Sequence, residues 1–318
     1  MLMRDEVSRV LGEVKKVILG KDEVIEKVLM AILAQGHVLL EDVPGTGKTT
    51  MALAFAKALG LEYRRVQFTS DTMPSDIVGF SVYDREEGRL SYKPGAIMTN
   101  LLLADEINRT SSKTQSALLE AMEEKHVSVD GVTRDLPRPF IVLATENPVG
   151  SAGTQMLPNS QLDRFLVQLS MGYPSLETQA SILRDRHAKN PLDQVVPVLT
   201  RDELEVLIAD TATVHLDDAL YLYIATLAEA TRTDEYVELG LSPRGALALT
   251  RMAQACAFVA GRDYVTPDDV LTVFVDVTCH RLILNSKARL NEVNAAGVVS
   301  RVASSVPIPQ RTVANPLA

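Results

Sequence analysis

Apolar residues follow two different spacings along the first half of the chain. From Val7 to Ala34 they recur every three or four positions, with a break near Gly20, which predicts two helices. Helical spacing returns at 49–59 and 114–124. Short, nearly continuous apolar runs predict buried strands at residues 37–41, 101–104, 140–145 and 165–169, and residues 63–68 are strand-like. Strands that alternate with helices predict an α/β fold with a mostly parallel sheet.

Two stretches interrupt this alternation and predict small hairpins. Phe80–Tyr83 and Leu90–Tyr92 flank a charged turn that contains Gly88. Residues 126–135 alternate around Asp130-Gly131, a dipeptide typical of tight hairpin turns. Two interpretations stay open: the hairpins make functional contacts, or they are loops with minor strands.

After Tyr173-Pro174 the pattern becomes helical. A connecting helix is predicted over 178–187, and three further helix starts follow. They are the capping box Thr200/Glu203, Ser242-Pro243 before a helix that runs to Ala260, and Thr266-Pro267. The sequence therefore predicts an α/β domain over 1–190, with the N-terminal helices and both hairpins, and an all-helical domain over 191–318.

Composition narrows the class of protein. Of the 318 residues, 46% are hydrophobic and 23% charged, as in soluble folded chains, and the net charge is −9. An acidic chain is a poor match for sequence-independent binding of nucleic acid, which requires Lys and Arg against phosphates.

The expected location is the cytoplasm. Cys256 and Cys279 lie in apolar helical patterns and predict buried free thiols, which suits a reducing compartment. The N-terminus has no apolar signal core, and the longest charge-free apolar stretch, Val28–Leu40, is too short to span a bilayer. The sequence thus predicts a soluble protein without membrane insertion.

A phosphate-binding loop follows the first predicted strand and opens a helix. Gly45 and Gly47 let the backbone turn its N–H groups toward phosphate oxygens, while Lys48 supplies a cation and the Thr49 hydroxyl can coordinate Mg²⁺. Asp42 replaces the first glycine of the usual pattern. The predicted cradle for ATP or ADP consists of Val43, Pro44, Gly45, Thr46, Gly47, Lys48, Thr49 and Thr50.

Two carboxylates end the strand predicted at 101–104. The carboxyl edge of an open parallel sheet is where its ligands bind. We expect Asp105 to hold Mg²⁺, directly or through water, and Glu106 to polarise the attacking water. At the end of another strand, the amide of Asn147 can reach the γ-phosphate or that water, although Asn147-Pro148 is also a common turn.

Five motifs, in the order VPGTGKT, LLLADEINR, ATENP, QLDRF and LSPRG, resemble those of AAA+ ATPases and, within them, the MoxR family. The resemblance covers nearly the whole chain from Val17. It implies an αβα nucleotide-binding domain with a parallel five-stranded sheet of order 5-1-4-3-2, and a small helical lid. It also implies a homo-oligomeric ring, usually hexameric, with ATP at subunit interfaces.

The resemblance also assigns individual residues. It implies nucleotide contacts at Ile18 and Gly20, sensor 1 at Asn147, the arginine finger at Arg164 and sensor 2 at Arg244. Arginine suits the last two roles because its fixed charge can stabilise a transferring phosphoryl group. Arg109 either faces a subunit interface or is an ordinary surface arginine.

The sequence thus predicts an Mg²⁺-dependent ATPase that remodels, assembles or activates a protein partner, in the manner of a chaperone. The family suggests a separate protein with a von Willebrand factor A domain as the client. The alternatives are a motor acting on nucleic acid, a metal-chelatase-type motor subunit and a non-hydrolysing nucleotide switch. Both hairpins carry charges of both signs, which favours a protein partner and no nucleic acid.

Overall fold

The computed structural model describes residues 2–41, 45–86, 88–146, 156–185 and 191–309. These fall into two compact units, Met1–Thr211 and Ala212–Ala318. Among the described residues, no helix combines the length and the apolarity that a membrane span requires.

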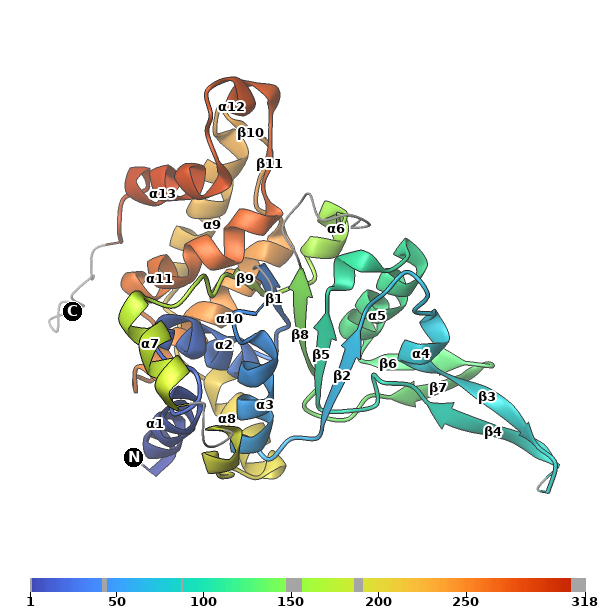
Figure 1. The fold of residues 1–318 in the computed structure, drawn as a ribbon. Coiled ribbons are helices and arrows are strands. Elements are labelled where there is room, and N and C mark those ends of the chain that lie inside the picture. Colours follow the sequence, from blue (N-terminus) through green and yellow to red (C-terminus); the bar gives the residue numbers. More distant parts are fainter. Residues whose placement is uncertain (1, 42–44, 87, 147–155, 186–190, 310–318) are drawn as a thin grey trace, which may run out of the picture. The chain divides into compact units, whose positions relative to one another are not determined.

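The first unit is built around a five-stranded parallel sheet in the order β2-β5-β8-β1-β9 (Figure 1). Its strands are β1 (Val38–Glu41), β2 (Tyr63–Gln67), β5 (Leu101–Asp105), β8 (Ile141–Glu146) and β9 (Val167–Leu169). Counted along the chain as strands one to five, the order read from β9 is 5-1-4-3-2, as expected. Its helices are α1 (Leu2–Lys15), α2 (Asp22–Leu33), α3 (Lys48–Ala58), α4 (Pro74–Val78), η1 (Ile107–Arg109), α5 (Ser112–Glu124), α6 (Asn159–Leu162), α7 (Leu176–Asp185), η2 (Pro191–Gln194) and α8 (Arg201–Ala212).

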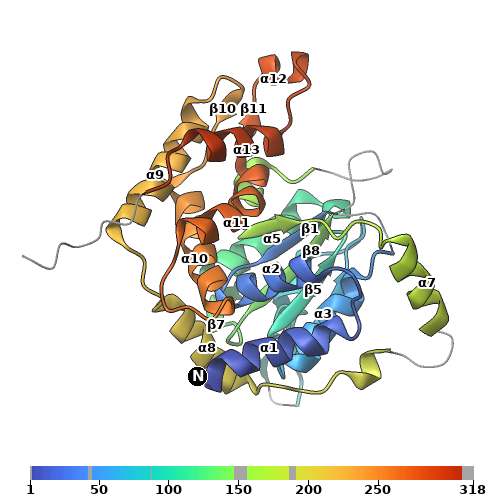
Figure 2. The ribbon, with the colours of Figure 1, turned by 90° about the vertical axis from the view of Figure 1, so that its left-hand side faces the viewer.

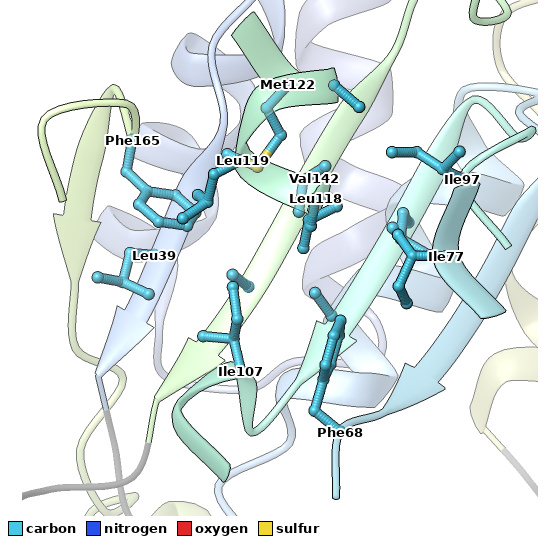
Figure 3. Close-up of a cluster of buried hydrophobic side chains, with 14 of the residues drawn as sticks. Leu39, Phe68, Ile77, Ile97, Ile107, Leu118, Leu119, Met122, Val142 and Phe165 are labelled. Atoms are coloured by element: carbon cyan, nitrogen blue, oxygen red, sulfur yellow. The ribbon is translucent and has the colours of Figure 1, made fainter. Parts of the chain in front are cut away.

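Both faces of this sheet are covered by helices, which is why the inner strands β1, β5 and β8 are apolar and buried up to their polar carboxyl ends. Helices α4 and α5 cover one face, where Leu118 and Met122 pack with Leu39 and Val142 in a fully apolar cluster (Figure 3). Helices α1, α2 and α3 lie on the opposite face (Figure 2). Because β1, β5 and β8 pair in parallel, their carboxyl ends share one edge of the sheet.

Both predicted hairpins form, and they lie side by side (Figure 1). The first consists of β3 (Gly79–Asp84) and β4 (Arg89–Pro94), and the second of β6 (His126–Val129) and β7 (Val132–Asp135). The guanidinium of Arg134 lies 4.0 Å from the centre of the Tyr92 ring, and the Tyr92 hydroxyl donates to the Val78 carbonyl. Tyr92 therefore joins the bases of the two hairpins.

The second unit holds α9 (Asp218–Thr233), α10 (Pro243–Val259), α11 (Pro267–Thr278), η3 (Cys279–Arg281), α12 (Ser286–Leu290) and α13 (Ala295–Ser305). This unit is helical, as expected, with one addition: β10 (Val237–Leu239) and β11 (Ile283–Leu284) form a small antiparallel pair. Strands this short leave no alternation in the sequence. Cys256 and Cys279 are free thiols, the first buried and the second half-buried.

The boundary between the units also differs from the expected one, at 211/212 in place of 190/191. The connecting segment is bound to the first unit by its backbone. Val198 and Leu199 donate to the Ala58 carbonyl at the end of α3, and Lys57 donates to the Leu192 carbonyl. These contacts join residues far apart in the sequence, so local composition gives no sign of them.

Candidate nucleotide site

The phosphate-binding loop enters α3 through two glycines with left-handed backbone. Gly45 has φ of 87° and Gly47, directly before α3, has φ of 96°, a conformation that a side chain disfavours. Lys48 begins the helix and is only 7% exposed, and Thr49 and Thr50 follow in its first turn. The N-terminal end of a helix carries partial positive charge, which suits an anion. Val43 and Pro44 lie outside the described residues.

A cavity of about 300 Å³ opens beside this loop. One wall is Gly45, Thr46 and Gly47, and another is the α1–α2 connection with Ile18. Gly20 stands in the same connection, where an added Cβ would lie 3.0 Å from the Thr178 hydroxyl oxygen. The third wall comes from Tyr173, Pro174 and the α7 residues Gln179, Ile182 and Leu183. Sequence reasoning missed this wall, which it treated only as a connecting helix.

Asp105 and Glu106 lie at the carboxyl end of β5, as expected. The Thr145 hydroxyl, at the end of β8, donates to Oδ1 of Asp105 over 2.6 Å and accepts from the Glu106 backbone N–H over 2.8 Å. Arg65 of β2 donates to Oδ2 of Asp105 over 2.7 Å. Sequence reasoning missed the roles of Thr145 and Arg65, although Thr145 is the last residue of the strand predicted at 140–145.

Glu106 has left-handed backbone, with φ of 57° and ψ of 50°. Non-glycine residues adopt this conformation at a cost, and it occurs often at functional sites. Arg109, one turn further along η1, donates to Oε2 of Glu106 over 2.7 Å. In this structure, the carboxylate expected to polarise water is thus held by an arginine of its own chain.

A second pair of carboxylates stands at the same edge. Glu41 and Glu146 end β1 and β8 in register, and Gln168 donates to Glu41. Burial raises the pKa of the Glu146 carboxyl from 4.5 to about 7, the negative charge of Glu41 adds to the rise, and the Leu157 backbone N–H opposes it. Sequence reasoning did not single out either residue, because the pKa of a carboxyl depends on burial.

This shifted pKa predicts a pH-dependent stability. The folded state binds the Glu146 proton more tightly than the unfolded state does, so protonation of Glu146 stabilises the fold. This contribution to the free energy of unfolding is complete below pH 4.5 and is lost as the pH rises to about 7. The full shift corresponds to at most roughly 3 kcal/mol. Without nucleotide, Glu146→Gln should therefore unfold at higher urea concentration than the parent at pH 8, with a flatter pH profile. The exposed Glu120→Gln is the control, and identical profiles for Glu146→Gln and the parent would contradict the shift.

The arginines expected to sense phosphate lie in different places. Arg164, just before β9, is part-buried and its Nε donates to Oε2 of Glu123 on α5 over 2.7 Å. Arg244 is the second residue of α10, in the other unit. Asn147 lies outside the described residues. Within the first unit, the structure thus brings together the loop, Asp105 and Glu106 along one sheet edge.

Comparison with known proteins defines the class first. Residues 37–167 match the family described as ATPase associated with various cellular activities, and residues 229–302 match the AAA lid domain. The chain is an ATP-hydrolysing enzyme of the AAA+ class.

Individual relatives define the family. Chaperone MoxR1 of Mycobacterium tuberculosis is 40% identical over 96% of this chain and 82% of the relative. The uncharacterized protein YeaC of Bacillus subtilis is 44% identical over 97% of this chain and 98% of its own length. A crystal structure from Cytophaga hutchinsonii superposes with a TM-score of 0.90 at 36% identity, over 96% of each chain. The chain belongs to the MoxR family of AAA+ ATPases.

Proposed function

We propose that this enzyme couples ATP hydrolysis, in a homo-oligomeric ring, to the remodelling or activation of a protein partner. The observation that carries the proposal is that the sheet edge with the carboxylates is connected through two of its strands to the two hairpins. The strands that bring Asp105 and Glu146 to this edge are each preceded in the chain by a hairpin, and Tyr92 and Arg134 join the two hairpins.

The nucleotide is assigned to the cavity beside the phosphate-binding loop. The adenosine would lie between Ile18 and the α7 residues, and the phosphates would follow the backbone from Gly45 into α3. Two features support this assignment: the positive φ of Gly45 and Gly47, and the positive end of α3 with the buried Lys48. We include Val43, Pro44, Thr46, Thr49, Thr50 and Gly20 in the same site.

The residues present also fit a magnesium ion. The Thr49 hydroxyl and the Asp105 carboxylate are hard oxygen donors of the kind that Mg²⁺ prefers. Bound Mg²⁺ would neutralise charge on the phosphates during transfer. Asp105 would contribute a carboxylate whose direction is fixed by Thr145 and Arg65.

The remaining roles follow from chemistry at the γ-phosphate. Glu106 orients and polarises the attacking water, which requires its release from Arg109. Asn147 contacts the γ-phosphate or that water. Arg164 stabilises the transferring phosphoryl group on the nucleotide of a neighbouring subunit. Arg244 contacts the bound ATP, and this contact moves the lid.

The assembly is proposed to be a hexameric ring in the cytoplasm. Its client is proposed to be a separate protein that carries a von Willebrand factor A domain. The relative named Chaperone MoxR1 supports action on proteins. The free thiols of Cys256 and Cys279 are compatible with a reducing compartment.

The client-binding surface is assigned to the first hairpin. Tyr83 and Leu90 pair across its strands near the turn, and each is 61% exposed. Phe80 and Val82 are also exposed, on the other side of the hairpin. Such an apolar surface with mixed charges suits a protein, whereas nucleic acid would require a continuous basic stripe.

The replacement Tyr83→Ser, Leu90→Ser should abolish client capture and leave basal ATP hydrolysis unchanged. Capture is measured by mass spectrometry of proteins that copurify with the Glu106→Gln form in ATP, with and without the hairpin replacement. Val132→Ser, which changes a 51% exposed apolar position in the second hairpin, is the control. ATP hydrolysis is measured with Glu106 intact.

Nucleic acid is the competing partner and is tested in the same preparations. The account expects neither single- nor double-stranded DNA to stimulate hydrolysis at physiological salt. Strong stimulation that persists there, or unchanged protein capture by the hairpin variant, would contradict the proposed function.

A further inference from the structure

Thr145 contacts both of the carboxylate residues that end β5, Asp105 and Glu106. Its side chain is fully buried at the carboxyl end of β8. Its single hydroxyl donates to Oδ1 of Asp105 and also accepts from the backbone N–H of Glu106. A hydroxyl can do both at once, whereas a valine of the same shape can do neither. One side chain of β8 thus fixes two consecutive residues of β5.

The hydroxyl acts on Asp105 together with Arg65. Asp105 accepts one hydrogen bond at each carboxylate oxygen, from Thr145 on one neighbouring strand and from Arg65 on the other. Two donors on opposite sides fix both the direction and the rotation of the carboxylate. Charge-assisted bonds of this kind are the stronger ones.

The second bond acts on Glu106 where its backbone is unusual. The chain turns from β5 into η1 through the left-handed conformation of Glu106. A strained backbone persists only where its surroundings hold it. The Thr145 oxygen satisfies the N–H of Glu106 at this turn, and thereby sets where its carboxylate side chain begins.

We propose that Thr145 is a positioning residue for ATP hydrolysis. Its hydroxyl holds Asp105 and Glu106 in one arrangement and couples the positions of both residues to the end of β8. Since β8 leads directly to Asn147, a displacement at that strand end reaches both carboxylates through one hydroxyl. The inference rests on the roles proposed above for Asp105 and Glu106.

The test compares Thr145→Val, which keeps the shape, with Thr145→Ser, which keeps the hydroxyl. Replacing the outer partner of a metal-binding carboxylate typically lowers metal affinity or activity by about 10–100-fold. Thr145→Val should lower kcat by such a factor and weaken Mn²⁺ binding in the presence of ADP, measured by electron paramagnetic resonance. The affinity for ADP without metal should stay unchanged. Thr145→Ser should behave nearly as the parent protein.

Two outcomes would overturn the inference. One is a folded Thr145→Val protein with parental kcat and Mn²⁺ affinity, and the other is a Thr145→Ser protein as impaired as Thr145→Val. If Thr145→Val does not fold, Thr145→Cys replaces it, and its weak S–H donor should give intermediate values; parental values would then count against the inference. Asp105→Asn and Glu106→Gln serve as references. If both lose hydrolysis while Thr145→Val does not, only the inference on Thr145 fails, and no step of this test depends on a protein partner.

Discussion

Replacing Glu106 with Gln should slow ATP hydrolysis by about 10²–10⁴-fold, the usual contribution of a positioned acid or base, while nucleotide binding persists. The amide keeps the size of the side chain and removes the negative charge that polarises water. Lys48→Ala should instead abolish ATP binding, because Lys48 is the buried cation at the start of α3. Phosphate release and the binding of a fluorescent ATP analogue separate the two effects.

Glu146→Gln is the sharpest control for this assignment. Its carboxyl stands on the next strand of the same edge, with a pKa raised by burial to about 7, which is also suited to accepting a proton. The account expects Glu106→Gln to lose hydrolysis and Glu146→Gln to retain most of it. If only Glu146→Gln loses hydrolysis, Glu146 and not Glu106 polarises the attacking water. Rapid turnover by Glu106→Gln would by itself exclude Glu106 from this role.

Arg164→Ala should lower hydrolysis by about 10³–10⁵-fold, the range typical of an arginine finger. The ion pair of Arg164 with Glu123 is partly exposed to solvent, and such pairs contribute little stability. Its exchange for a neighbour's phosphate therefore costs little. Glu123→Gln, which releases Arg164 from this pair, should keep or increase the activity.

Action between subunits is tested by mixing two inactive proteins. Rings that contain both Arg164→Ala and Glu106→Gln subunits include interfaces with an intact Glu106 on one side and an intact Arg164 on the other. Partial recovery of hydrolysis on mixing is the expected result. No recovery, with mixed assembly verified by differential tagging, would contradict action in trans.

Most of the fold could be predicted because the determining signals are local. The apolar runs that form β1, β5 and β8 are buried on both faces, and each is short and bounded by polar residues. The same holds for the loop from Gly45 to Lys48, whose glycines are required where they stand. Capping residues such as Ser242 and Thr266 also act within a few positions of the helices that they begin.

The missed features depend on contacts between distant segments. The α7 wall of the cavity beside the phosphate-binding loop faces residues more than a hundred positions earlier in the chain. The contact of Tyr92 with Arg134 joins two different hairpins. Thr145 and Arg65 reach Asp105 only because β2, β5 and β8 are adjacent in the sheet. Patterns along the sequence cannot show pairs of this kind.

The most direct test of the account is a structure of the Glu106→Gln protein assembled with Mg²⁺ and ATP. We expect phosphates along the backbone from Gly45 to Thr49, Mg²⁺ near Thr49 and Asp105, and Arg164 of a neighbouring subunit turned from Glu123 toward the γ-phosphate. ATP bound away from this loop, or a ring in which every Arg164 still pairs with Glu123 of its own chain, would contradict it.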